Sequence, residues 1–128
     1  MALCGLLNHD EVLNHAVEFT GDGIACLSMD QRMSIANMTT EWGALAGVFP
    51  FDQVLRDYLD SRADAFGGRR PGVRRAGSLG SYARAEVGAW WEARGELAPA
   101  AGAAYAIELE LDLSTVIPHV SGPNDIKT

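Results

Sequence analysis

One glutamate near the start of the chain has neighbours that could support acid–base chemistry. Glu18 lies in the run AVEFTG, among apolar and small residues and just ahead of a glycine turn. Glu41 is the only other carboxylate in unusual surroundings. A charge in apolar surroundings is costly unless it has a partner. Two interpretations of Glu18 stay open from these residues: an edge position on a half-exposed strand, or an acid at the end of a buried strand that could move a proton.

The other candidate ligands and nucleophiles are scattered along the chain. Cys4 and Cys26 lie in apolar surroundings and form no CxxC motif, and His9, His15 and His119 do not have metal-ligand spacing. Free cysteines are among the most buried residues. We therefore expect two buried free thiols, and no four-ligand metal site made from the thiolates of this chain alone.

Charge and hydropathy exclude several classes of partner. The formal net charge of −7 opposes binding to phosphate backbones, so we expect no nucleic-acid partner. No apolar run approaches the ~20 residues of a membrane span, and the N-terminus MALCGLLNHDE lacks the features of a targeting segment. A chain of 128 residues is long enough for one domain, so residues 1–128 are predicted to belong together.

The elements that must position Glu18 follow an α/β pattern. Three short runs are strand-like, in chain order ALCGLL, AVEFTG and ALAGVFP, and the first and third are typical of buried strands. Between the second and third, residues 29–43 are apolar on more than one side, which predicts a buried helix. Ser28 and Gln31 match a capping box at its start, and Gly43 can end it.

The second half of the chain continues with helices and one late strand. Residues 51–66 and 81–97 have helical spacing of their apolar residues, and between them residues 67–80 form a Gly/Arg-rich loop without periodicity. Residues 104–112 alternate apolar and acidic side chains, which predicts a half-exposed strand.

Two stretches resemble a known family. The run NHAVEFTGDGIACLSMDQRMSIANMTTEWGALAGVFPFD resembles the aconitase superfamily, in which a strand ending in E-[YF]-T-G-x-G leads into a helix with [CA]NM, then E-x-G-A and F-P-x-D. IANMTTEWGALAGVFP is most similar to the homoaconitase branch, which serves lysine biosynthesis in fungi. The tail ELDLSTVIPHVSGPNDIK resembles the family's L-x-P-x-x-x-G-P strand and turn. Residues 61–104 match neither stretch and are expected to be a variable insertion.

The resemblance implies part of an aconitase-type α/β/α three-layer domain in a [4Fe-4S]-dependent hydro-lyase. Such an enzyme interconverts homocitrate-like and homoisocitrate-like tricarboxylic acids through their dehydrated intermediate, in the mitochondrial matrix. One cluster iron acts as a Lewis acid on the substrate. Glu18 aligns with the family's strand-end glutamate, which pairs with an active-site histidine and tunes its protonation.

Several parts of the family pattern are absent from this chain. The cluster cysteines, the DSH segment, the substrate-binding arginines and the swivelling domain with its serine base are missing, and Cys4 and Cys26 do not fall at ligand positions. We therefore expect an internal piece of a larger enzyme, without a cluster or activity of its own, whose partners are the cluster-binding and swivelling domains. The alternative is a stand-alone, non-catalytic binding or interaction module derived from the same fold.

Overall fold

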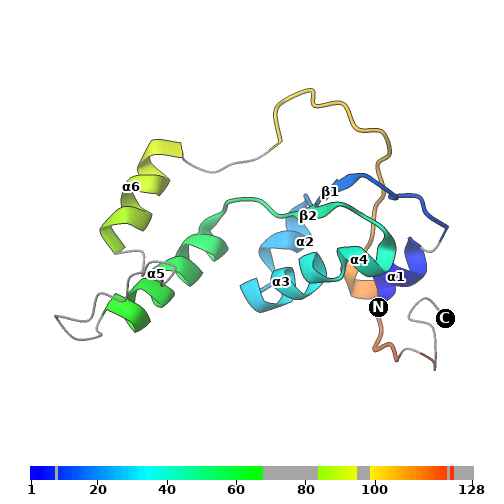
Figure 1. Ribbon diagram of the computed structural model, residues 1–128, viewed down its shortest axis with the longest axis horizontal. Coiled ribbons are helices and arrows are strands. Elements are labelled where there is room, and N and C mark those ends of the chain that lie inside the picture. Colours follow the sequence, from blue (N-terminus) through cyan, green and yellow to red (C-terminus); the bar gives the residue numbers. More distant parts are fainter. Residues whose placement is uncertain (8, 68–83, 95–98, 121, 123–128) are drawn as a thin grey trace. The chain divides into compact units, whose positions relative to one another are not determined.

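The chain folds as two compact units. The computed structural model describes residues 1–7, 9–67, 84–94, 99–120 and 122. Unit 1 comprises Met1–Phe49 and Ala101–Thr128, and unit 2 comprises Pro50–Ala100 (Figure 1). Unit 1 therefore contains Glu18 together with Ala101–Thr128, called the late segment below.

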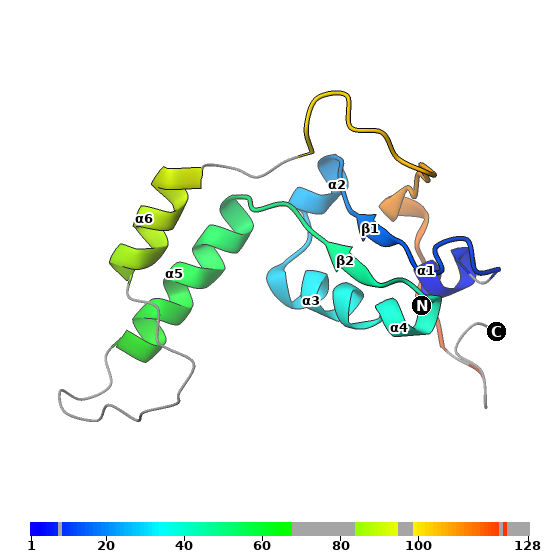
Figure 2. The same ribbon diagram turned by 45° about the horizontal axis from the view of Figure 1, so that its top comes forward.

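Unit 1 is organised around two parallel strands. β1 (Ala16–Glu18) pairs with β2 (Ala46–Val48), so that Ala16 lies opposite Ala46 and Glu18 lies opposite Val48. Parallel neighbours need a long crossover connection. The crossover consists of three helices, α2 (Asp22–Ala25), α3 (Met29–Asn37) and α4 (Thr39–Trp42), shown with the strand pair in Figure 2. Helices and a parallel sheet agree with the predicted α/β class.

The ends of the helical segment before β2 form as the sequence predicts. The Ser28 hydroxyl accepts a hydrogen bond from the Gln31 N–H (3.3 Å), and the Gln31 side chain accepts one from the Ser28 N–H (2.8 Å), which completes a capping box. Gly43 ends α4 in the left-handed conformation, with φ of 80°. The prediction of one buried helix over residues 29–43 is wrong in two respects. The helix is interrupted at Met38, and Met33 is exposed, because the described residues cover only one face of α3.

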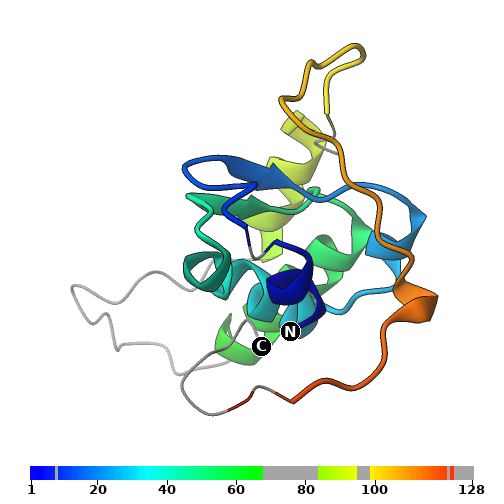
Figure 3. The same cartoon turned by 90° about the vertical axis from the view of Figure 1, so that its right-hand side faces the viewer.

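Two of the predicted strands are also wrong. The run ALCGLL forms the short helix α1 (Ala2–Leu6), because a short apolar run does not distinguish a strand from a buried helical turn. Residues 104–112 form no strand, and Figure 3 shows them as a trace without an arrow before the 3-10 helix η1 (Leu113–Thr115). Alternation defines two faces of a segment, but a strand also needs a neighbour that accepts its hydrogen bonds. Nothing in the described part of the chain provides that neighbour.

The core of unit 1 fixes the end of β1. Its fully or nearly buried apolar residues are Cys4, Leu7, Val12 and Trp42. Phe19 packs against this cluster with its ring edge-on to Trp42, at 5.9 Å between centroids, and stacks on Phe49 at 4.5 Å. Aromatic pairs of this kind add to the stability gained from burial alone. Because Phe19 follows Glu18 directly, the packing of its ring restrains the backbone that carries the glutamate.

Close packing between β2 and the crossover helices depends on Gly47. A Cβ atom at this position would lie 3.3 Å from the Cα of Ala36, the Cε2 of Phe19 and the Cγ2 of Thr39. The Ala36 atom belongs to the backbone of α3 and cannot move aside alone. Any larger residue would therefore push the strand away from the helices.

Gly47→Val should lower the free energy of unfolding by about 1–3 kcal/mol, the usual cost of overpacking a tight core. Chemical denaturation followed by far-ultraviolet circular dichroism measures this change. Gly5→Ala is the matched control, because no atom lies within 4 Å of a Cβ at Gly5 and alanine is favoured inside a helix. Equal midpoints for Gly47→Val and the unmodified chain would contradict the close packing described above.

Unit 2 contains two long helices. α5 (Gln53–Gly67) and α6 (Arg84–Arg94) contact each other, and Ala63 and Val87 are buried. Phe51 lies 5.2 Å from the ring of Trp91. The structure confirms both helices that the sequence predicts, although their ends differ from the predicted ones. The predicted Gly/Arg-rich loop over residues 67–80 lies outside the described residues, except that its first residue ends α5. Within the described residues, no helix has the length and apolar character needed to cross a bilayer.

Candidate functional site

Glu18 lies at the edge of the sheet where the carboxyl ends of both strands meet. It is the last residue of β1 and lies opposite Val48, the last residue of β2. Beyond this point the Phe19 N–H still donates to the Val48 carbonyl at 2.9 Å. Open α/β sheets bind their ligands outside the carboxyl ends of the strands. The position of Glu18 is therefore one where an acid can meet a ligand.

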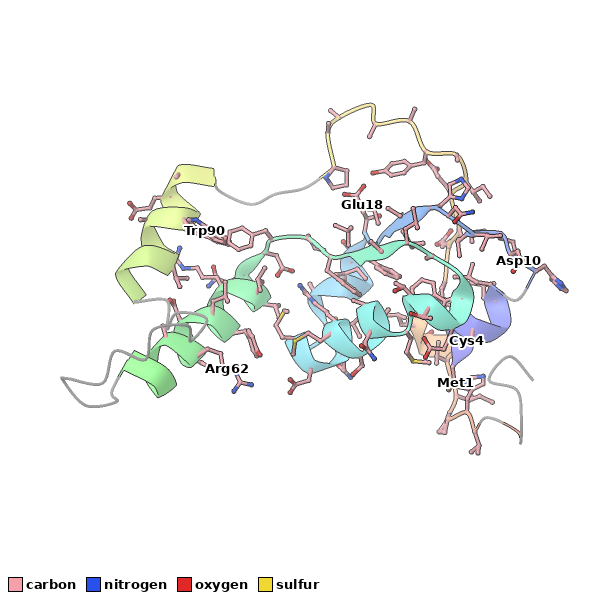
Figure 4. All side chains as sticks on the ribbon, viewed as in Figure 1. Met1, Cys4, Asp10, Glu18, Arg62 and Trp90 are labelled. Carbon is pink, nitrogen blue, oxygen red and sulfur yellow. The ribbon has the colours of Figure 1, made fainter. Side chains whose placement is uncertain are left out.

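The surroundings of Glu18 differ from the buried strand end considered from the sequence. Its side chain is exposed, and in β1 only Val17 is half-buried, which agrees with the edge-position interpretation. The carboxylate nevertheless has a partner from the far end of the chain. The hydroxyl of Tyr105 donates to the Oε2 atom of Glu18 at 2.5 Å. Figure 4 shows Glu18 next to the yellow segment that returns to unit 1.

The contact with Glu18 favours the protonated form of the Tyr105 hydroxyl. Its pKa is raised from the ordinary value, first by the hydrogen bond to Glu18, then by loss of solvent and by the negative charges of Glu18 and Glu108. An unperturbed tyrosine already titrates near pH ~10. A raised pKa means that the hydroxyl keeps its proton throughout the neutral range and loses it only at strongly alkaline pH.

The cysteines do not assemble into a ligand site. Cys4 is buried as expected, whereas the expectation that Cys26 is buried is wrong. Cys26 follows α2, a four-residue helix that buries none of its residues. In the part of the chain that the structure describes, no three His, Cys, Asp or Glu side chains are arranged to hold a metal ion. The Nδ1 of His15 lies 2.9 Å from the Leu13 carbonyl, within its own turn.

Two buried polar atoms lack hydrogen-bond partners among the described residues. These are the Oε2 of Glu41 and the Nε1 of Trp42, which are neighbours on α4. The sequence singles out Glu41 and predicts packing positions for Trp42 and Tyr105, but it assigns neither of these two aromatic residues to the site. The helical spacing of Trp42 with Ile35 and Met38 is a local signal for its burial. Tyr105 has none that points to Glu18.

Comparison with known proteins identifies the family of the chain. The model of the aconitase family (aconitate hydratase) matches residues 1–128. The chain belongs to the aconitase family. The homoaconitases named as mitochondrial from Candida parapsilosis, Yarrowia lipolytica and Cryptococcus neoformans var. neoformans are 45%, 46% and 47% identical to it, each over 99% of the chain. No solved structure matches.

The matched region is a small part of these aconitase-family relatives. The chain spans 17% of the Candida parapsilosis protein and 18% of the Cryptococcus neoformans protein. Its described residues do not fit an iron–sulfur cluster of the kind the family uses, which needs several thiolate ligands at one place. The chain has only two cysteines, and one of them is buried in the core. In an aconitase-family enzyme that contains this chain, the ligands of any cluster must therefore come from residues outside the chain.

Proposed function

We propose that the chain is a section of a homoaconitase-type hydro-lyase of lysine biosynthesis. The complete enzyme interconverts homocitrate-like and homoisocitrate-like tricarboxylic acids through their dehydrated intermediate, and it works in the mitochondrial matrix. The observation that carries this proposal is the identity of about 45% to mitochondrial homoaconitases over 99% of the chain. Similarity of this extent to complete enzymes favours an enzyme section over an independent binding module.

Glu18 is the residue of this chain that takes part in the chemistry. Its carboxylate lies at the carboxyl edge of the strand pair and is exposed, so a group from another part of the enzyme can reach it. A carboxylate beside a histidine favours the charged imidazolium and holds the ring in one orientation. Glu18 therefore positions a histidine from the rest of the polypeptide, which holds or moves a proton at the reacting carbon or oxygen.

The remaining parts of the enzyme are the partners of this chain. The cluster-binding and swivelling domains supply the [4Fe-4S] cluster ligands, the substrate contacts and the serine base. The chain supplies the strand pair that carries Glu18 and the core behind it. The late segment contributes apolar side chains that the described residues leave exposed: Tyr105, Ile107 and Leu109. Exposed apolar surface of this kind is typical of an interface.

A chimeric enzyme tests the proposed function directly. The 127 matched residues of the Candida parapsilosis homoaconitase are replaced by the corresponding residues of this chain. The chimera should hydrate homoaconitate and support growth of a homoaconitase-deficient yeast without lysine. The unmodified homoaconitase is the positive control.

The isolated chain provides the second arm of the same test. Anaerobic incubation with iron and sulfide should give no stoichiometric cluster absorbance, because two cysteines cannot supply a full ligand set. A chimera that folds and binds its cluster but does not turn over would contradict the proposed function. A cluster bound at one per isolated chain, and lost on mutating either cysteine, would contradict the assignment of the ligands to other parts of the enzyme.

A further inference from the structure

We infer that Tyr105 is a positioning residue for Glu18. The inference rests on the proposed function, because it concerns how the carboxylate of that function is held. It is carried by one contact, the hydrogen bond from the Tyr105 hydroxyl to the Glu18 Oε2 atom, between residues 87 positions apart.

The contact restricts the carboxylate without blocking it. An exposed glutamate samples several rotamers, and fixing it for each turnover costs conformational entropy. The tyrosine hydroxyl holds Oε2, and the carboxylate keeps Oε1 and further lone pairs for a second donor. Glu18 is therefore oriented in advance toward a histidine that arrives from another part of the enzyme.

The stretch of chain that carries Tyr105 makes a second contact with unit 1 further along, at Leu113. The Leu113 side chain packs against Gly23 so closely that a Cβ at Gly23 would lie 2.9 Å from the Leu113 Cδ1. Leu113 begins η1, whose start is fixed by Asp112: its carboxylate accepts a hydrogen bond from the Ser114 N–H at 2.9 Å. The late segment is therefore attached at two places to the chain around the end of β1, at Glu18 and at Gly23.

The protonation of Tyr105 suits a positioning role rather than an acid–base role. A general acid works best when its pKa lies near the working pH. The pKa of Tyr105 is raised by Glu18 and Glu108. The hydroxyl therefore keeps its proton and donates it in a hydrogen bond to Glu18, and it neither takes nor gives a proton during turnover.

A double-mutant cycle in the active chimera tests this inference. Tyr105→Phe removes the hydroxyl and keeps the ring. It should lower kcat about 10-fold, because the carboxylate loses the donor that holds it in one orientation. KM should change less than about twofold, and the cluster absorbance should be unchanged, because the contact acts on an orienting group in the chemical step. Tyr58→Phe, on α5 in unit 2, is the matched control and should be silent.

The same substitution made in the Glu18→Gln enzyme tests the role of Tyr105 separately from the proposed function. In Glu18→Gln enzyme, Tyr105→Phe should change kcat by less than about twofold, since the group that it positions has lost its charge. The role of Tyr105 would be overturned if Tyr105→Phe lowered kcat about 10-fold in both the Glu18 and the Glu18→Gln enzymes, or if it left kcat of the Glu18 enzyme unchanged. In either case, a low kcat of the Glu18→Gln enzyme would still support the proposed function. A fully active Glu18→Gln enzyme would overturn the role of Glu18, and the inference with it.

Discussion

Glu18→Gln should lower kcat of the complete enzyme by about 10²- to 10⁴-fold, the usual cost of losing one positioned acid–base element. Glutamine keeps the shape of the side chain and can still accept the hydrogen bond from Tyr105. It lacks the negative charge that stabilises a neighbouring imidazolium. Because Glu18 is not an iron ligand in this proposal, the cluster content should stay the same. Initial rates at full cluster occupancy, over a range of substrate concentrations, measure kcat and KM separately.

The matched control for Glu18→Gln lies in the late segment. Glu110 is exposed, so Glu110→Gln removes the same charge from the same unit without touching the candidate site. Its effect on kcat should be within about twofold. If Glu18→Gln retained more than about half of the activity, a contribution of the size typical of acid–base groups would be excluded. Glu18 would then be a structural residue at the end of β1.

Trp42→Ala should lower the free energy of unfolding by about 3–5 kcal/mol, which is typical of large-to-small changes at buried aromatic residues. The Trp42 side chain is 1% exposed and belongs to the cluster with Cys4, Leu7 and Val12. Its ring also supports Phe19, the residue after Glu18. Alanine would leave a cavity behind the strand end and release that ring. Denaturation of the chimera, followed by circular dichroism and by residual activity, measures both consequences.

Two further variants show how much of this loss of stability comes from apolar packing at a buried position. Trp42→Phe keeps much of the apolar contact and removes an indole N–H that has no partner among the described residues, so it should cost less than alanine. Leu45→Ala removes a large apolar side chain that is 70% exposed, and it should change stability by about 0.5 kcal/mol or less. A similar effect of Trp42→Ala and Leu45→Ala would show that the core of unit 1 lies elsewhere.

Local patterns were sufficient to predict the elements whose signals lie within a few residues. The runs AVEFTG and ALAGVFP contain β1 and β2, and the Ser28–Gln31 capping box starts α3. Helices with a regular apolar face, such as α5, were equally predictable from the sequence. The helices form from interactions between residues close in sequence, so their patterns are informative without knowledge of the rest of the fold. The apolar runs mark the two strands, although β1 and β2 pair through residues that are distant in sequence.

Features that depend on distant neighbours could not be predicted in the same way. Residues 104–112 alternate apolar and acidic side chains, yet a strand forms only where another strand pairs with it, and in the structure both sets of side chains are largely exposed. The exposure of Cys26 depends on what covers α2, and nothing in its own sequence decides that. Glu18 is singled out by its local sequence, a carboxylate among apolar and small residues ahead of a glycine turn, and the family motif assigns it a role. Its partner Tyr105 is 87 residues away and carries no local signal of the contact.

The division of unit 1 into two stretches of chain affects how the molecule assembles. During synthesis from the N-terminus, β1 and β2 can pair as soon as Phe49 has emerged, whereas Tyr105 follows only after all of unit 2. The contact between Tyr105 and Glu18 then closes a long loop. The entropy of closing a flexible loop grows only with the logarithm of its length, so doubling that length costs about 0.6 kcal/mol. Relatives can therefore lengthen or shorten the chain between the two stretches at little cost to the pair at the end of β1.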